Sequence, residues 1–97
     1  MPYTDMGRLT QEIGAVEALG WLAESKRVKI DFKFGTEQNW QDGLDDLVED
    51  LDPYMTGRFM VMLGNEALLT DDTAEYVIHF DEDSDRDVIS LRWFIKI

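Results

Sequence analysis

Two clusters of carboxylates are the parts of this sequence whose residue types and spacing could do chemistry. They lie in QDGLDDLVEDLD (41–52) and in DEDSDRD (81–87). Clustered carboxylates can bind a calcium ion, which prefers oxygen ligands, or a basic protein surface. We treat both clusters as candidate partner-binding sites. Their candidate residues are Asp42, Asp45, Asp46, Glu49, Asp50 and Asp52 in the first cluster, and Asp81, Glu82, Asp83 and Asp85 in the second.

The first cluster falls on a predicted helix. Apolar residues recur at spacings of three and four, which is typical of a helix with one buried face; they are Trp40, Leu44, Leu47, Val48 and Leu51. Thr36 can cap this helix and Pro53 stops it. The acids occupy the opposite side, and no Lys or Arg occurs in 36–57. Like charges at these spacings repel, so either a functional acidic surface or a plain solvated helix face is expected.

The second cluster begins with the D-x-D-x-D pattern of an EF-hand calcium loop. It departs from that loop at two decisive positions. Arg86 stands where the sharp turn needs Gly, and Arg92 stands where a bidentate Glu is needed. A polar hairpin loop or a second negative patch for a basic partner is therefore favoured, with calcium binding kept as an alternative.

Catalytic patterns are missing from the sequence. There is no cysteine, so disulfides, thiolate metal sites and cysteine nucleophiles are excluded. His79 is the single histidine, which is too little for a common zinc ligand set. It is expected to be a structural or surface residue. We predict that the protein is not an enzyme and uses no cofactor or metal.

The remaining periodicities define the fold class. A helical stripe from Met6 to Leu22 predicts a first helix that is capped by Thr4 and ends near Ser25. Alternation predicts strands at 28–34, 74–80 and 89–97, the last two joined as a hairpin through 81–87. The apolar run in 58–63 predicts a central strand covered on both faces. The expected order is α-β-α-β-β-β, an α+β fold with a mostly antiparallel sheet and helices packed on one face. With 97 residues, the chain is expected to be a single compact domain, 1–97.

The charge balance narrows the classes of partner. The net charge is −12, and residues 37–87 hold sixteen acids against two bases. Such a field opposes direct binding to nucleic acid and favours a basic partner. No apolar run approaches the roughly 20 residues of a membrane span, and no secretory signal is evident at the start of the sequence. A cytoplasmic protein without membrane contact is expected.

A short, cysteine-free, strongly acidic chain with the helix QDGLDDLVEDLD and the loop DEDSDRD resembles the DNA-mimic inhibitors that phages use against host defence. In size and charge it is most similar to the small acidic anti-CRISPR proteins of type I-F systems. The resemblance covers the whole chain as composition and rests on no shared motif. It implies a stoichiometric inhibitor that occupies the basic duplex-binding site on the DNA-binding subunit of a CRISPR surveillance complex. The alternative from a different class is a calcium-binding or purely structural acidic α+β domain.

Overall fold

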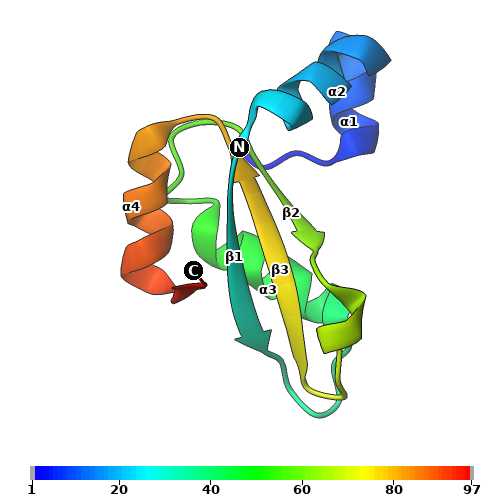
Figure 1. Cartoon of the computed structure of the whole chain (residues 1–97), viewed down its shortest axis with the longest axis vertical. Coiled ribbons are helices and arrows are strands. Elements are labelled where there is room, and N and C mark those ends of the chain that lie inside the picture. The colour runs from blue at the N-terminus through cyan, green and yellow to red at the C-terminus, as the bar shows by residue number, and fades with distance from the viewer. Residues whose placement is uncertain (1, 97) are drawn as a thin grey trace.

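The computed structural model describes residues 2–96, and it has the α+β architecture expected from the sequence (Figure 1). Helices and strands are interleaved along the chain, and their order differs from the expected α-β-α-β-β-β at both ends. The elements are α1 (Met6–Ile13), α2 (Ala15–Glu24), β1 (Lys26–Lys33), α3 (Trp40–Leu51), β2 (Phe59–Leu63), the short 3-10 helix η1 (Glu66–Leu68), β3 (Thr73–Phe80), α4 (Asp83–Arg92) and β4 (Ile95–Lys96). No helix among the described residues is long and apolar enough to cross a membrane.

The four strands form one antiparallel sheet in the order β2-β3-β1-β4. The prediction that 58–63 is a central strand is wrong, because β2 lies at an edge of the sheet, and beyond it residues 2–96 form a single bridge, between Tyr3 and Phe59. The expected coverage on both faces is present for the first three residues of β2. Phe59 and Val61 face the main core, while Met60, on the other face, is buried by α1 and α2.

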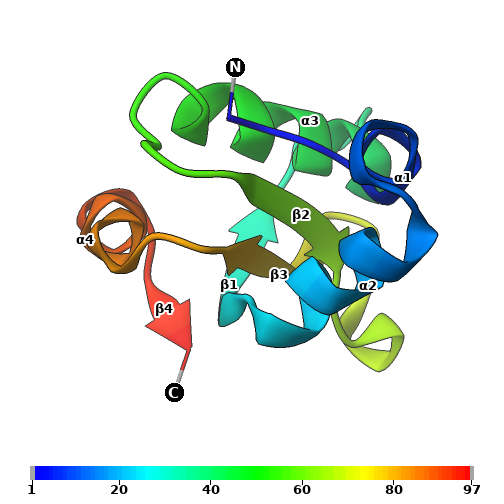
Figure 2. The ribbon, with the colours of Figure 1, turned by 90° about the horizontal axis from the view of Figure 1, so that it is seen from above.

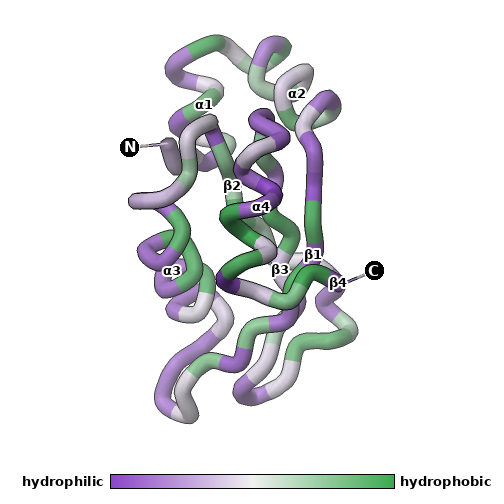
Figure 3. Tube along the Cα trace, turned by 90° about the vertical axis from the view of Figure 1, so that its left-hand side faces the viewer, coloured by the Kyte–Doolittle hydropathy of each residue, from purple (hydrophilic) through white to green (hydrophobic). Residues whose placement is uncertain are grey.

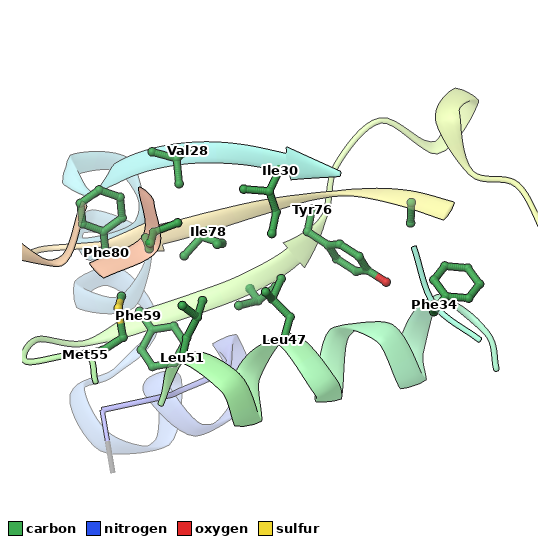
Figure 4. Close-up of a cluster of buried hydrophobic side chains, with 13 residues drawn as sticks. Val28, Ile30, Phe34, Leu47, Leu51, Met55, Phe59, Tyr76, Ile78 and Phe80 are labelled. Carbon is green, nitrogen blue, oxygen red and sulfur yellow. The ribbon is translucent and has the colours of Figure 1, made fainter. Parts of the chain in front are cut away.

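The main core lies between the sheet and the helices α3 and α4 (Figures 2 and 4). Strand residues that alternate along β1 and β3 point into it, as a period of two requires. Leu47 and Leu51 enter from α3 and Ile89 enters from α4, and all three side chains are fully buried. Trp40 packs against this core from the first turn of α3 but stays partly exposed.

The opposite face of the sheet is covered at one end by α1 and α2, so helices pack on both faces and not on one as expected (Figure 2). The predicted first helix is in fact two helices. They are separated at Gly14, because its φ of 89° is incompatible with a right-handed helix. The cap of α1 is also different: Asp5, not Thr4, accepts the N–H of Arg8 at 2.8 Å. This pair of helices forms a second small core from Leu9, Ala18 and Met60.

The predicted C-terminal strand and its hairpin are wrong. Residues 83–92 form α4, and of the described residues in 89–96 only Ile95–Lys96 pair with β1; Ile97 lies outside the described residues. The acids of 81–87 therefore begin a helix, where negative charge in the first turn is favourable. The alternation of Ile89, Leu91, Trp93 and Ile95 suggested a strand, but Ile89 and Trp93 are also one helical turn apart and both contact the core.

Candidate acidic interface

Helix α3 positions the first carboxylate cluster, and its start is fixed by a reciprocal cap. The side chain of Asn39 accepts the N–H groups of Gln41 and Asp42 at 2.9 and 3.0 Å. In return, Asp42 Oδ2 accepts the N–H of Asn39 at 3.2 Å. This capping box replaces the expected cap by Thr36. The start of the helix is therefore well defined, with the carboxylate of Asp42 beside it.

The inner side of α3 lies close to the sheet at Gly43. A Cβ atom there would lie 2.6 Å from Tyr76 Oη and 3.0 Å from Phe34 Cδ1, so only glycine permits this approach. Tyr76 Oη donates a hydrogen bond of 2.6 Å to the carbonyl of Trp40. Burial, with a smaller contribution from Asp46, raises the pKa of Tyr76 to about 12, which keeps this donor protonated. The close contact fixes which side of α3 faces solvent.

The solvent side of α3 carries four exposed carboxylates, which we call the acidic stripe: Asp42, Asp45, Asp46 and Glu49. Their spacing of three and four places them within an arc of about 100° over two turns. Asp46 accepts a hydrogen bond of 3.2 Å from the amide of Gln38. Within residues 2–96, Asp45 and Glu49 make no hydrogen bond or ion pair with another side chain. The stripe therefore presents charge that the protein itself does not neutralise.

Asp50 was predicted to belong to this exposed surface, and the structure assigns it a different role. Its carboxylate accepts hydrogen bonds from Arg92 Nε at 2.8 Å and from Trp93 Nε1 at 2.9 Å. The hydrogen bond from Arg92 lowers the pKa of Asp50, aided by Trp93 and opposed by burial. Asp50 thus joins the end of α3 to the end of α4. A sequence pattern gives no sign of this, because the partners lie 42 and 43 residues away.

Asp52 is also structural. It is buried, and its Oδ1 accepts the backbone N–H of Tyr3 at 3.0 Å, which ties the N-terminal segment to the end of α3. Of the six candidates in the first cluster, four thus remain at the surface as the acidic stripe.

Asp85 departs furthest from the sequence prediction. Its side chain has no exposed surface, and it accepts three hydrogen bonds. Thr56 donates from its backbone N–H and its hydroxyl, each at 2.9 Å, and Gly57 donates its N–H at 2.8 Å. Asp85 therefore fastens the first turn of α4 to the loop before β2, and it is unavailable to a partner.

The other acids of the second cluster lie at the start of α4, beside α2. Asp81 accepts a hydrogen bond of 3.0 Å from Trp21 Nε1, and Asp83 lies 3.7 Å from Lys26 Nζ. Glu82 is exposed. The other end of α4, about 13 Å along the helix axis, is the end that contacts α3 through Arg92. The two acidic clusters therefore do not form one continuous surface.

This arrangement also bears on the calcium alternative. The three carboxylates of the D-x-D-x-D pattern diverge: Asp81 turns to Trp21, Asp83 lies near Lys26, and Asp85 is buried against Thr56. In the part of the chain that the structure describes, no group of three His, Cys, Asp or Glu residues is placed to hold a metal ion. The pattern thus lacks the convergent oxygens that calcium requires.

His79 lies where α2 meets the sheet. It is buried, and its Nδ1 lies 3.1 Å from the hydroxyl of Ser25. Burial lowers the pKa of His79, and Arg27 adds to this effect, so the ring is neutral at pH 7. The hydroxyl of Ser25 also donates a hydrogen bond of 2.7 Å to the carbonyl of Leu22. The contact between Ser25 and His79 therefore links the end of α2 to β3.

Comparisons of the chain with protein-family models, with curated proteins and with solved structures find no match.

Proposed function

We propose that this protein is an acidic inhibitor whose α3 occupies a basic, nucleic-acid-binding surface of another protein. The acidic stripe is the single observation that carries this proposal. Four carboxylates lie exposed on one side of a helix, and the nearest bases in sequence lie outside 36–57. Like charges at these spacings lower helix stability, and the chain could avoid this cost with one lysine. Selection for a partner explains why it does not.

The spacing and rigidity of the stripe suit a surface that binds phosphates. Side chains one helical turn apart have Cβ atoms about 5–6 Å apart, which is on the scale of neighbouring phosphates along a nucleic-acid strand. The capping box at Asn39 and the close contact at Gly43 fix the helix before it meets a partner. A preorganised surface loses less entropy on binding.

Three bases of β1 lie on the far side of the sheet from the acidic stripe. Arg27, Lys29 and Lys33 alternate with the core residues of β1, so they lie on the sheet face opposite α3. Asp31 shares that face, and Lys33 is paired there with Asp72 at 3.8 Å. These bases therefore lie away from the acidic stripe and do not compete with a basic partner for its carboxylates.

The most specific form of the proposal is a phage anti-CRISPR protein that acts in the cytoplasm of its host. Its partner would be the DNA-binding subunit of a type I-F surveillance complex, and bound inhibitor would exclude target DNA. The support for this form is the likeness in size and charge to such inhibitors, together with the acidic stripe. Restriction enzymes and nucleases offer basic surfaces of the same kind, so they belong in the test.

The test compares two variants of equal charge. D45N/D46N/E49Q neutralises three acids of the stripe, and E12Q/E17Q/E24Q neutralises three exposed acids on α1 and α2. Binding of each to a type I-F surveillance complex, a type I restriction enzyme and a non-specific nuclease is measured by biolayer interferometry. We expect one target to bind, with affinity about tenfold or more weaker for the stripe variant and nearly unchanged for the control.

Two further readouts test competition with DNA. The complex should weaken steeply as salt rises, because several exposed charge pairs form at once. Duplex DNA with the recognition sequence of the target should displace the protein. Equal loss in both variants, or binding that is independent of salt, would contradict the proposal.

A further inference from the structure

A second surface of the molecule, unrelated to the acidic stripe, is apolar and exposed. Leu91 at the end of α4 is 86% exposed and Phe94, just before β4, is 96% exposed. In Figure 3, which faces this side of the molecule, the trace from the end of α4 to β4 is largely hydrophobic. Leaving two large apolar side chains in water costs free energy that burial would recover. Their adjacency therefore indicates a contact surface.

The same region holds an open edge of the sheet. β4 pairs with β1 on one side and, among residues 2–96, has no strand on its other side. A shallow groove of about 360 Å³ runs beside it, lined by residues 90–95. An exposed edge offers backbone N–H and C=O groups to an incoming strand. The exposed apolar side chains and the open edge thus belong to one surface, which we call the C-terminal patch: Leu91, Phe94, Ile95 and Lys96.

We propose that the C-terminal patch binds a second copy of this chain, with β4 of each copy paired antiparallel about a twofold axis. An edge strand paired with its own copy is self-complementary, as a twofold interface requires. The sheet would continue from one protomer into the next. The two α4 helices would lie on the same face of that sheet, so Leu91 and Phe94 of both copies could cover the junction.

Charge is the reason to choose a second copy over another partner. Residues 88–96 contain no acid, and both of their bases are already neutralised. Arg92 is paired with Asp50, and Lys96 lies 2.7 Å from Glu75 and 3.1 Å from Asp31. The patch therefore offers no free charge to attract a nucleic acid or a charged protein. It is also a place where two molecules of net charge −12 can meet without facing each other's carboxylates, with Asp87 one turn away along α4 at the margin.

This proposal predicts a salt dependence opposite to that of a DNA mimic. The apolar contact drives association while the net charge of each copy opposes it. Salt screens that repulsion, so the dimer should become tighter as salt rises. Sedimentation equilibrium at several protein and salt concentrations measures this directly, with the monomer mass of 11.3 kDa as reference.

Two matched variants locate the interface. L91S/F94S removes the exposed apolar groups of the patch, and V16S/L19S removes a similar exposed pair from α2, where Val16 is 83% exposed. We expect the first to weaken dimerisation by about 100-fold or more and the second to leave it nearly unchanged. Because all four side chains are exposed, both variants should fold, which circular dichroism verifies.

A spin-label measurement tests the twofold geometry. The chain has no cysteine, so D87C and E17C each introduce a single labelling site. In the dimer, labels at position 87 should lie closer together than labels at position 17. The proposal is overturned by a monomer at every concentration and salt, by equal loss in both serine variants, by tightening at low salt, or by the shorter distance at position 17.

The result is independent of the proposed inhibitor function. L91S/F94S should keep its binding to the basic partner, and D45N/D46N/E49Q should keep the dimer. Failure of one proposal therefore leaves the other standing.

Discussion

The acidic stripe of α3 and the acidic segment 81–87 resemble each other in the sequence, but the structure gives them different roles. In the stripe, Asp45 and Glu49 face solvent without a partner among the described residues. In the segment, Asp85 is wholly buried and Asp81 accepts a hydrogen bond from Trp21, while Glu82 and Asp83 stay exposed, Asp83 at 3.7 Å from Lys26. The density of carboxylates in the sequence therefore does not show which of them stay exposed and unpaired. The groups that stand opposite each carboxylate in the fold decide this.

The difference arises from what stands opposite each group. Asp85 lies in the first turn of a helix, where negative charge is favourable, and it faces two backbone N–H groups that need an acceptor. The stripe runs from Asp42 in the first turn of α3, where it takes part in the capping box, to Glu49 in the last turn, and Asp45 and Glu49 have no such acceptor role. The charge of Asp85 supports the fold, whereas the charges of Asp45 and Glu49 remain exposed to solvent.

The largest expected effect comes from Asp85→Ala. The change removes three hydrogen bonds and leaves the N–H groups of Thr56 and Gly57 without their acceptor. We expect a loss of about 3–5 kcal/mol in the free energy of unfolding. A domain of this size has about 5–15 kcal/mol in total, so the variant should be close to unfolding. Urea denaturation measures the loss, with Asp87→Ala, an exposed acid on the same helix, as the control. Equal stability of the two variants would show that the buried carboxylate does not support the fold.

A smaller effect is expected at Asp50, which the sequence placed on the binding surface. Asp50→Asn weakens the hydrogen bonds from Arg92 and Trp93. Since this site is partly exposed, we expect a loss of about 1–2 kcal/mol. A double-mutant cycle with Arg92→Met isolates the coupling, because the contact of the Arg92 guanidinium with the Tyr54 ring, 4.5 Å to the ring centroid, is lost with and without Asp50 and cancels in the cycle. A coupling energy near zero would mean that the two residues act separately and that Asp50 remains a candidate for partner binding.

The pH dependence of the Asp50 effect follows from its lowered pKa. A carboxyl whose pKa is lower in the folded state stabilises the fold at pH values above its unfolded pKa, and this contribution is lost as pH falls through the folded pKa. The stability difference between wild type and Asp50→Asn should therefore be full above about pH 4 and shrink below it. Thermal melting of both proteins from pH 7 to pH 3 measures the difference. A gap that widens at low pH would contradict the assigned role.

The elements that sequence reasoning recovered are those stabilised by a single periodic face. α3 has apolar residues at regular helical spacing, and the residues of β1 and β3 that enter the main core follow the predicted alternation, although Glu75 and His79 on the other face of β3 are buried as well. In these segments the local pattern and the tertiary environment agree, so the pattern alone identifies the structure. The acidic stripe follows directly, because it is the opposite side of a correctly predicted helix.

The elements and roles that were missed depend on distant contacts. The apolar residues of α4 fit both a helical and a strand periodicity. Neither periodicity indicates that Asp85 contacts Thr56, 29 residues away. In the sequence, Asp50 is indistinguishable from the neighbouring acids of α3. Its different role depends on Arg92, which is 42 residues later in the chain. One local signal was available: acids at 83 and 85 match the favoured charge of a first helical turn.

The smallest expected effect is on the stability of the stripe variant D45N/D46N/E49Q. Four pairs within the stripe have spacings of three or four, and each contributes a repulsion of about 0.2–0.5 kcal/mol. Glu49 also lies in the last turn of α3, where negative charge is unfavourable. Asn at position 46 still offers an oxygen to the amide of Gln38. The free energy of unfolding should therefore stay the same or rise slightly, and the gain should disappear at high salt as the repulsion is screened.

The control E12Q/E17Q/E24Q should change stability by less, because its three acids lie five and seven residues apart. If the stripe variant instead loses more than about 1 kcal/mol, its carboxylates support the fold, and the difference between the stripe and Asp85 would be one of degree and not of role.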